Sequence, residues 1–161
     1  MITLVLGGAR SGKSEVGEQM AGALGADVTY VATAVVDPGD DDWARRIEKH
    51  RARRPLSWTT VEAGDLPAVL AEVAGPVLVD SLGPWVAACV EVDPDALCHA
   101  LAHRPGDTVV VSEEVGLGVH PSSEAGRHFR DVLGTVNRAV ADVADEVVLV
   151  IAGRVLRLDR P

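Results

Sequence analysis

The stretch GGARSGKS, residues 7–14, has the residue types and spacing of a phosphate-binding loop. It matches G-x-x-x-x-G-K-[S/T], in which glycines let backbone N–H groups turn toward a phosphate. Lys13 would reach the outer phosphates of a nucleoside triphosphate, and the Ser14 hydroxyl would ligate Mg²⁺. A glycine-rich turn that binds nothing is the competing interpretation, which the flanking strand and helix patterns disfavour. The predicted contacts are Gly7, Gly8, Ala9, Arg10, Ser11, Gly12, Lys13 and Ser14, with Lys13 also catalytic.

A carboxylate on the metal side of such a site is expected at the carboxyl end of another buried strand. Asp80 ends the apolar run PVLVD, and Glu113 follows TVVVS, so both acids meet this condition. We favour Asp80 as the partner of Ser14 in holding Mg²⁺ and keep Glu113 as the alternative. An acid at a strand end can also simply cap a turn, so spacing alone does not decide between them.

A histidine among arginines occupies the segment DDDWARRIEKHRARRP, residues 40–55. Acids at the start and bases at the end suit a helix dipole, so a solvated surface helix is one interpretation. In the other, Arg46 and Arg54 lie one turn from His50 on the same helix face. Their charge would disfavour imidazolium and leave a neutral, nucleophilic ring, while their guanidinium groups could hold phosphate oxygens. The pattern alone leaves both interpretations open.

Hydrophobic patterning predicts the scaffold that must position these residues. Near-continuous apolar runs, typical of central parallel strands covered on both faces, span residues 2–6, 27–32, 76–80, 108–112 and 146–151. A weaker strand is expected at 57–62, and the alternating run 154–158 predicts an antiparallel hairpin. Helical patterns span residues 14–24, 40–53, 65–74, 93–102 and 124–144. The stretch DSLGPW from Asp80 is expected to form a loop.

The alternation of strands and helices predicts an α/β fold with right-handed crossovers. We expect a P-loop, RecA-like NTPase fold: a mostly parallel central sheet, helices on both faces and a C-terminal antiparallel edge hairpin. No repeat or linker interrupts the chain, so a single nucleotide-binding domain over residues 1–161 is expected.

Charge and composition exclude several classes of function. A formal net charge of −9 leaves no broad basic surface for nucleic acid or an anionic membrane. Two cysteines are too few for a disulfide framework or a four-ligand metal site, and His99 with His103 lacks a third zinc ligand. The apolar run at residues 2–6 is too short for a signal peptide or a membrane span. We therefore expect a cytoplasmic protein with no nucleic-acid partner and no membrane span.

Six stretches together resemble one known family. They are GGARSGKS, YVATA, RIEKHRARRP, TVEAGDL, VLVDSLGPW and EVGLGVHPSSEAGRHFRDVLGTVNRAVADVADEVVLVIAG. On these motifs, which span nearly the whole chain, the sequence is identified as a member of the bifunctional adenosylcobinamide kinase/adenosylcobinamide-phosphate guanylyltransferase family of cobalamin biosynthesis. The resemblance implies phosphorylation of adenosylcobinamide by ATP or GTP. It further implies transfer of GMP from GTP, through a guanylyl-histidine, to adenosylcobinamide phosphate.

The same resemblance implies roles for individual residues. His50 would be the guanylylated histidine, and Glu62 could accept hydrogen bonds from the N1–H and exocyclic amine of guanine. The loop 113–121 would border the corrinoid phosphate. A homo-oligomer is expected, with a trimer as one form. Beyond residues 7–14, the implied nucleotide contacts are Ala32, Thr33, Ala34, Arg51, Ala52, Arg53, Arg54, Glu62 and Asp80.

Two other classes of function remain open at this point. A P-loop kinase of another small metabolite would keep Lys13, Ser14 and Asp80 but gives no reason for His50 with its arginines. A RecA-like nucleotide-binding module without small-molecule chemistry would also need no covalent histidine.

Overall fold

The computed structural model describes residues 1–33 and 53–160. In this part of the chain one sheet has the strand order β3-β2-β4-β5-β1-β6-β7. Neighbouring strands in this order, from β3 to β6, pair in parallel, and β7 runs antiparallel to β6. The strands are β1 (Ile2–Gly7), β2 (Thr29–Ala32), β3 (Thr59–Glu62), β4 (Val77–Asp80), β5 (Thr108–Glu113), β6 (Glu146–Ile151) and β7 (Arg154–Arg157).

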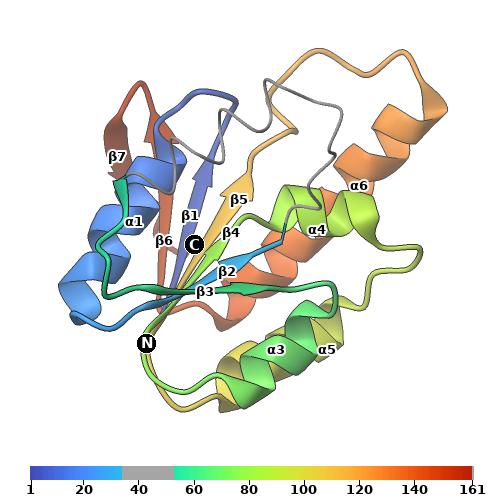
Figure 1. Cartoon of the computed structure of the whole chain (residues 1–161). Helices are drawn as coiled ribbons and strands as arrows, with labels where there is room; N and C mark the ends of the chain where they lie inside the picture. The colour runs from blue at the N-terminus through green and yellow to red at the C-terminus, as the bar shows by residue number, and fades with distance from the viewer. Residues whose placement is uncertain (34–52, 161) are drawn as a thin grey trace.

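Helices cover both faces of the sheet (Figure 1). They are α1 (Lys13–Leu24), α3 (Leu66–Glu72), α4 (Leu82–Ala88), α5 (Pro94–His103) and α6 (Glu124–Val143). Helix α1 packs on one face, over Val5, Val111 and Val148, and the other four helices enclose a larger core on the opposite face. Burial of strand residues on both faces explains why the central strands are almost continuously apolar.

The expected fold class is confirmed: a P-loop NTPase fold with a mostly parallel sheet, two helical layers and a C-terminal antiparallel hairpin. No strand or helix boundary among the described elements that were predicted differs by more than two residues. Nearly all of the helix expected at residues 40–53 lies outside the described residues.

The loop expected at DSLGPW is wrong, because helix α4 begins at Leu82. Pro84 is compatible with a helix here since it lies in the first turn, where a backbone N–H has no intrahelical acceptor. Gly83 leaves room for Glu113, because a Cβ at this position would meet the end of the Glu113 side chain and the carboxylate would have to shift. A short buried helix with Gly and Pro at its start does not show the usual helical sequence pattern.

The β6–β7 hairpin supports the loop that precedes α1. Ala152 and Gly153 both have positive φ, as a two-residue type I′ turn requires. The Gly153 N–H donates to the Ser11 carbonyl at 2.8 Å. The edge hairpin therefore fixes one side of the predicted phosphate-binding loop.

At the opposite end of the sheet, the amino ends of the strands are held by Arg104, which is only 7% exposed. Its two terminal nitrogens donate to the carbonyls of Val73, Gly75, Gly106 and Asp107 and to the hydroxyl of Thr108. This buried cation thus ties the loops that enter β4 and β5 to the end of α5.

None of the described helices is long and apolar enough to cross a membrane.

Candidate nucleotide site at the carboxyl ends of the strands

The loop between β1 and α1 has the geometry of a phosphate cradle. Gly12 precedes the helix with φ +93°, a left-handed conformation that favours glycine. Gly7 is equally constrained, since a Cβ there would collide with the Ser11 side chain. Lys13 folds back over the loop, with its ammonium 3.5 Å from the Gly8 carbonyl. The loop therefore leads directly into the positive end of α1, where anions bind.

Ser14 meets Asp80 at this edge of the sheet. The Ser14 hydroxyl donates to Asp80 Oδ1 at 3.2 Å, joining the first turn of α1 to the carboxyl end of β4. The other oxygen, Oδ2, accepts from the Tyr30 hydroxyl at 3.0 Å. Burial and the neighbouring Asp80 carboxylate raise the pKa of the Tyr30 hydroxyl above its ordinary value, so Tyr30 remains the donor.

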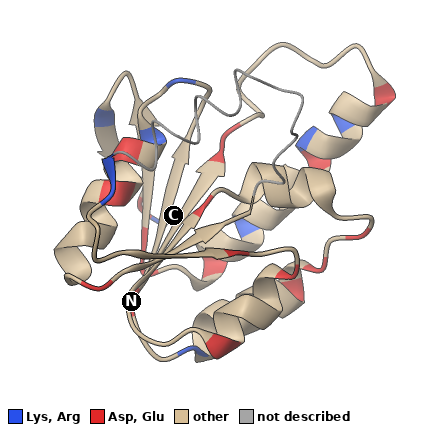
Figure 2. Ribbon diagram, viewed as in Figure 1, with Lys and Arg blue, Asp and Glu red and all other residues tan. Residues whose placement is uncertain are grey.

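Glu113 has different partners. Its carboxylate lies 3.5 Å from the Lys13 ammonium and accepts from the Ser81 hydroxyl and the Gly83 N–H, each at 2.8 Å. The two acids that sequence alone did not separate are therefore distinguished by contact: Asp80 meets Ser14, and Glu113 meets Lys13. Figure 2 shows acidic residues at the ends of central strands beside the basic loop before α1.

The ends of β2 and β4 are joined by Thr33, which is 3% exposed. Its hydroxyl accepts from the Ser81 N–H and donates to the Ser81 carbonyl.

The pairing register aligns Ala32 with Asp80 on one side and with Glu62 on the other. Because adjacent strands lie about 4.8 Å apart, the backbones of Glu62 and Asp80 are about 10 Å apart along this row. Glu62 is exposed at the edge strand.

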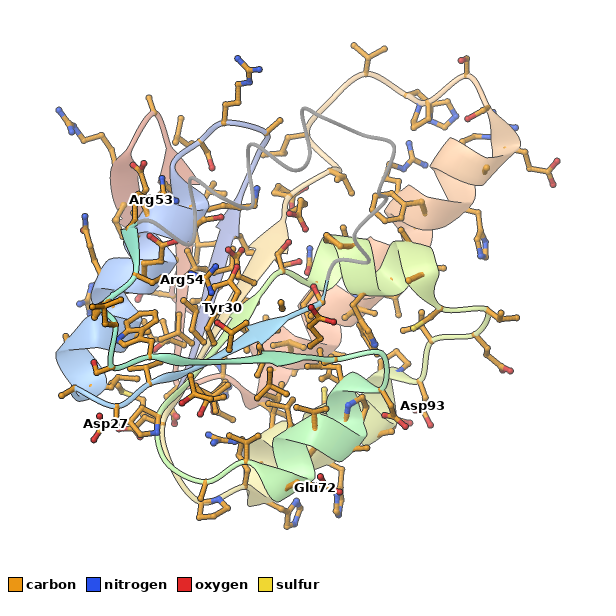
Figure 3. All side chains as sticks on the ribbon, in the orientation of Figure 1. Asp27, Tyr30, Arg53, Arg54, Glu72 and Asp93 are labelled. Atoms are coloured by element: carbon orange, nitrogen blue, oxygen red, sulfur yellow. The ribbon has the colours of Figure 1, made fainter. Side chains whose placement is uncertain are left out.

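Two arginines of the predicted basic segment lie within the described residues. Arg53 pairs with Glu15 at 2.7 Å and with Glu18 at 3.2 Å, both on α1. The Arg54 guanidinium carbon lies 3.6 Å from the centre of the Tyr30 ring. Figure 3 shows Arg54 beside Tyr30 and Arg53 beside α1. Both arginines therefore lie on the α1 side of the sheet, and Arg54 reaches the ring whose hydroxyl holds Asp80.

Some predicted site residues lie outside the described part of the chain. These are Ala34, His50, Arg51 and Ala52. At this edge of the sheet the structure forms a cluster of two sets of contacts, which are joined through the chain neighbours Lys13-Ser14 and Asp80-Ser81. One set is Ser14, Asp80 and Tyr30, and the other is Lys13, Glu113, Ser81 and Thr33.

The cluster offers oxygen ligands of the kind that Mg²⁺ prefers. A serine hydroxyl and a carboxylate oxygen 3.2 Å apart fit an ion that takes one or two protein ligands and completes its shell with water and phosphate oxygens. Among the described residues, no group of three or more His, Cys, Asp or Glu side chains is arranged as an all-protein metal cage. The donor set therefore suits a metal that arrives with a nucleotide.

Comparison with known proteins decides the family. The sequence model described as cobinamide kinase / cobinamide phosphate guanyltransferase matches residues 3–158. This chain belongs to that family. The expected resemblance is thus confirmed, as is the expected class of enzyme, a kinase and guanylyltransferase of cobalamin biosynthesis.

Individual relatives cover almost the whole chain. The bifunctional adenosylcobalamin biosynthesis protein CobP of Pseudomonas aeruginosa is 40% identical over 165 residues, covering 95% of this chain and 94% of its own. The bifunctional adenosylcobalamin biosynthesis protein CobU of Escherichia coli is 36% identical over 178 residues, covering 95% and 97%. A solved structure of the type III secretion ATPase EscN matches 94% of this chain and 43% of its own, at 11% identity and a TM-score of 0.48.

Sequence reasoning missed Tyr30 and Ser81 as members of the cluster. Tyr30 is the only tyrosine in a chain with 3% aromatic residues, and it lies between Thr29 and Val31 in β2. The available signal was an aromatic residue with a polar hydroxyl two positions before the implied nucleotide contacts Ala32 and Thr33. Ser81 carried no such signal beyond its position next to Asp80.

Proposed function

We propose that this enzyme phosphorylates the hydroxyl of adenosylcobinamide with ATP or GTP and then transfers GMP from GTP to the phosphate so formed. The proposal rests on one observation above all: at the strand ends Ser14 contacts Asp80, and the adjacent Lys13 contacts Glu113. A chain whose family description contains both activities needs such a triphosphate site for each of them.

In the kinase step the loop holds the triphosphate through its N–H groups and the positive end of α1. Lys13 leaves Glu113 for the outer phosphates, and the substrate hydroxyl oxygen attacks the γ-phosphorus. The bond from the γ-phosphorus to the β–γ bridging oxygen breaks, and the hydroxyl proton is released to solvent. Ser14 and Asp80 would hold Mg²⁺, which supplies charge neutralisation at the phosphates when bound.

In the guanylyl step a ring nitrogen of His50 attacks the α-phosphorus of GTP. The bond to the bridging oxygen breaks, pyrophosphate leaves, and a phosphorus–nitrogen bond holds GMP on the protein. A phosphate oxygen of adenosylcobinamide phosphate then attacks the same phosphorus and frees His50, giving adenosylcobinamide-GDP. A covalent intermediate divides one difficult displacement into two easier ones.

The remaining predicted contacts belong to this proposal. Ala32, Thr33 and Ala34 would line the nucleotide, and Glu62 would accept from the N1–H and amine of guanine, which adenine does not present. Residues 51–54 would contact the base and phosphates through their arginines. The exposure of Glu62 and its alignment with Ala32 support its role, because an exposed carboxylate at this edge is free to meet a base.

We further propose that one domain over residues 1–161 performs both steps as a homo-oligomer, of which a trimer is one form. Because nucleoside triphosphates are cytoplasmic metabolites, the enzyme is expected to act in the cytoplasm.

The variant His50→Ala tests the two steps separately. The variant should lose acid-labile, denaturation-stable label from α-labelled GTP, since no nucleophile remains. It should keep transfer of the γ-phosphate to adenosylcobinamide, which needs no protein nucleophile. Label that persists in His50→Ala would contradict the histidine assignment. A folded variant that has lost the kinase as well would place His50 in a shared nucleotide site.

A further inference from the structure

Tyr30 contacts two parts of the site at once. It is the only tyrosine of the chain and is 6% exposed. Its hydroxyl donates to Asp80, and its ring face lies beneath the Arg54 guanidinium (Figure 3). One side chain therefore joins the metal-side carboxylate to Arg54, an arginine that follows His50 in the segment 40–55.

The hydroxyl contact determines how the Asp80 carboxylate is oriented. In the β2–β4 register Tyr30 is opposite Leu78 and Ala32 is opposite Asp80, so Tyr30 lies diagonal to Asp80 on the same face of the sheet. From this position the hydroxyl holds Oδ2 at 3.0 Å, and Oδ1 lies toward the Ser14 hydroxyl. A carboxylate fixed through one oxygen presents the other in a constant direction, as outer partners of metal ligands do.

The ring contact determines where the Arg54 guanidinium lies. Its carbon is 3.6 Å from the ring centre, within cation–π distance, and its NH1 donates to the Thr60 hydroxyl at 3.2 Å. A planar guanidinium stacked on a ring loses less freedom on binding a phosphate than one that extends into solvent. Tyr30 therefore provides a platform on β2 for a side chain of the neighbouring segment.

We infer that Tyr30 is a positioning residue for the bound nucleotide: its hydroxyl orients Asp80 toward the metal, and its ring orients Arg54. The inference rests on the proposed function, in which Asp80 and Arg54 both serve the nucleotide. The two parts of the side chain have separate effects, because one acts on the metal side and the other on the arginine.

Two variants separate these effects. Tyr30→Phe removes the hydroxyl and keeps the platform, whereas Tyr30→Leu removes both. Binding of a non-hydrolysable GTP analogue is measured by calorimetry in EDTA and across a Mg²⁺ titration, so that the readout does not depend on turnover. Thr108→Val is the matched control, because it also deletes a buried hydroxyl but at the amino ends of the strands.

For Tyr30→Phe, the Mg²⁺ concentration at half-maximal enhancement of binding should rise about tenfold, as expected for loss of a hydrogen bond to a charged group. Its affinity in EDTA should stay within about twofold of the wild type, because the ring remains under Arg54. Tyr30→Leu should show the same Mg²⁺ shift and, in addition, an affinity in EDTA that is about fivefold weaker. Thr108→Val should change neither quantity.

A double variant tests whether the hydroxyl acts through Asp80. In an Asp80→Asn background, Tyr30→Phe should no longer shift the Mg²⁺ midpoint, since interacting residues are not additive. An unchanged midpoint in Tyr30→Phe alone, or a full additional shift in the double variant, would overturn the hydroxyl's role. Equal affinities of the Phe and Leu variants in EDTA would overturn the ring's role.

These outcomes are distinct from failure of the proposed function. If the wild type binds the analogue with Mg²⁺ and the variants behave as expected, but α-labelled GTP leaves no label, the guanylyl-histidine is wrong and the role of Tyr30 stands. If the wild type is labelled and Tyr30→Phe has a wild-type Mg²⁺ midpoint, the guanylyl-histidine stands and the role of the Tyr30 hydroxyl is wrong.

Discussion

Charged side chains lie at both ends of the sheet, but they differ in burial and in the partners they contact. At the amino ends, Arg104 is buried and gives its terminal nitrogens to backbone carbonyls of loops that are themselves fixed. At the carboxyl ends, Lys13 and Glu113 have side chains 12% and 26% exposed and pair with each other at 3.5 Å. The first arrangement has no contact that a ligand could replace, whereas the second has one.

Structural and chemical roles are divided between the two ends of the sheet. Carbonyl acceptors at the amino ends cannot leave Arg104 without losing their hydrogen bonds, and unmade buried hydrogen bonds are costly. The Lys13–Glu113 pair, at 3.5 Å and partly exposed, is a weak contact that a phosphate can displace. Substitutions at the two ends should therefore differ in kind: loss of activity at one end and loss of stability at the other.

The largest effect is expected from Lys13→Ala. Both the kinase and the guanylylation rates should fall by about 100- to 1,000-fold, the usual result of removing a preorganised charge partner of the reacting group. The melting temperature should change little, because the Lys13–Glu113 pair contributes little to stability. Steady-state rates and a thermal melt check both statements. Retained guanylylation in this variant would indicate two separate nucleotide sites.

Arg104→Met should have the opposite result. Carbonyls of Val73 and Gly75 would lose their donor, which should lower the free energy of unfolding by about 3 kcal/mol. For a chain of this size that corresponds to a fall in melting temperature of about 6 to 12 °C. Activity per folded molecule, measured well below the melting temperature, should be unchanged. A stable but inactive variant would contradict a purely structural role of Arg104.

Asp80→Asn should weaken Mg²⁺-dependent turnover by about tenfold and leave metal-free nucleotide binding nearly unchanged. Glu113→Gln is the matched control, because it neutralises the acid that contacts Lys13 and not Ser14. Its Mg²⁺ midpoint should remain that of the wild type. If Mg²⁺-dependent turnover is weakened in Glu113→Gln and not in Asp80→Asn, the metal-side role belongs to Glu113.

The smallest effect is expected from Thr108→Val. It removes one hydroxyl acceptor from Arg104, whose NH1 keeps the carbonyls of Gly106 and Asp107 as partners. Chemical denaturation should therefore show a loss of only about 1 kcal/mol. A loss as large as that of Arg104→Met would mean that the Thr108 contact alone holds this end of the sheet.

Much of this architecture can be predicted from sequence because it depends on local patterns. The central strands are continuous apolar runs, and the loop at residues 7–14 needs glycines where left-handed or crowded backbone occurs, as at Gly12 and Gly7. The same logic explains the hairpin turn at Ala152-Gly153. These features are determined by neighbours in the chain.

Other parts could not be predicted because they depend on strand register and on distant partners. Tyr30 meets Asp80, 50 residues further along the chain, only because β2 and β4 are neighbours in the sheet. The different partners of Asp80 and Glu113 likewise follow from the order β4-β5-β1, which brings β5 next to the phosphate loop. Helix α4 was not predicted because this short helix is buried around most of its circumference and therefore has no amphipathic pattern.

The most direct test of the proposed function is transfer of phosphate to adenosylcobinamide by the purified protein. With γ-labelled ATP or GTP, Mg²⁺ and adenosylcobinamide, label should appear on the corrinoid, should depend on the metal and should be absent in Lys13→Ala. A folded protein that binds the triphosphate with Mg²⁺ but transfers no label to the corrinoid would contradict it.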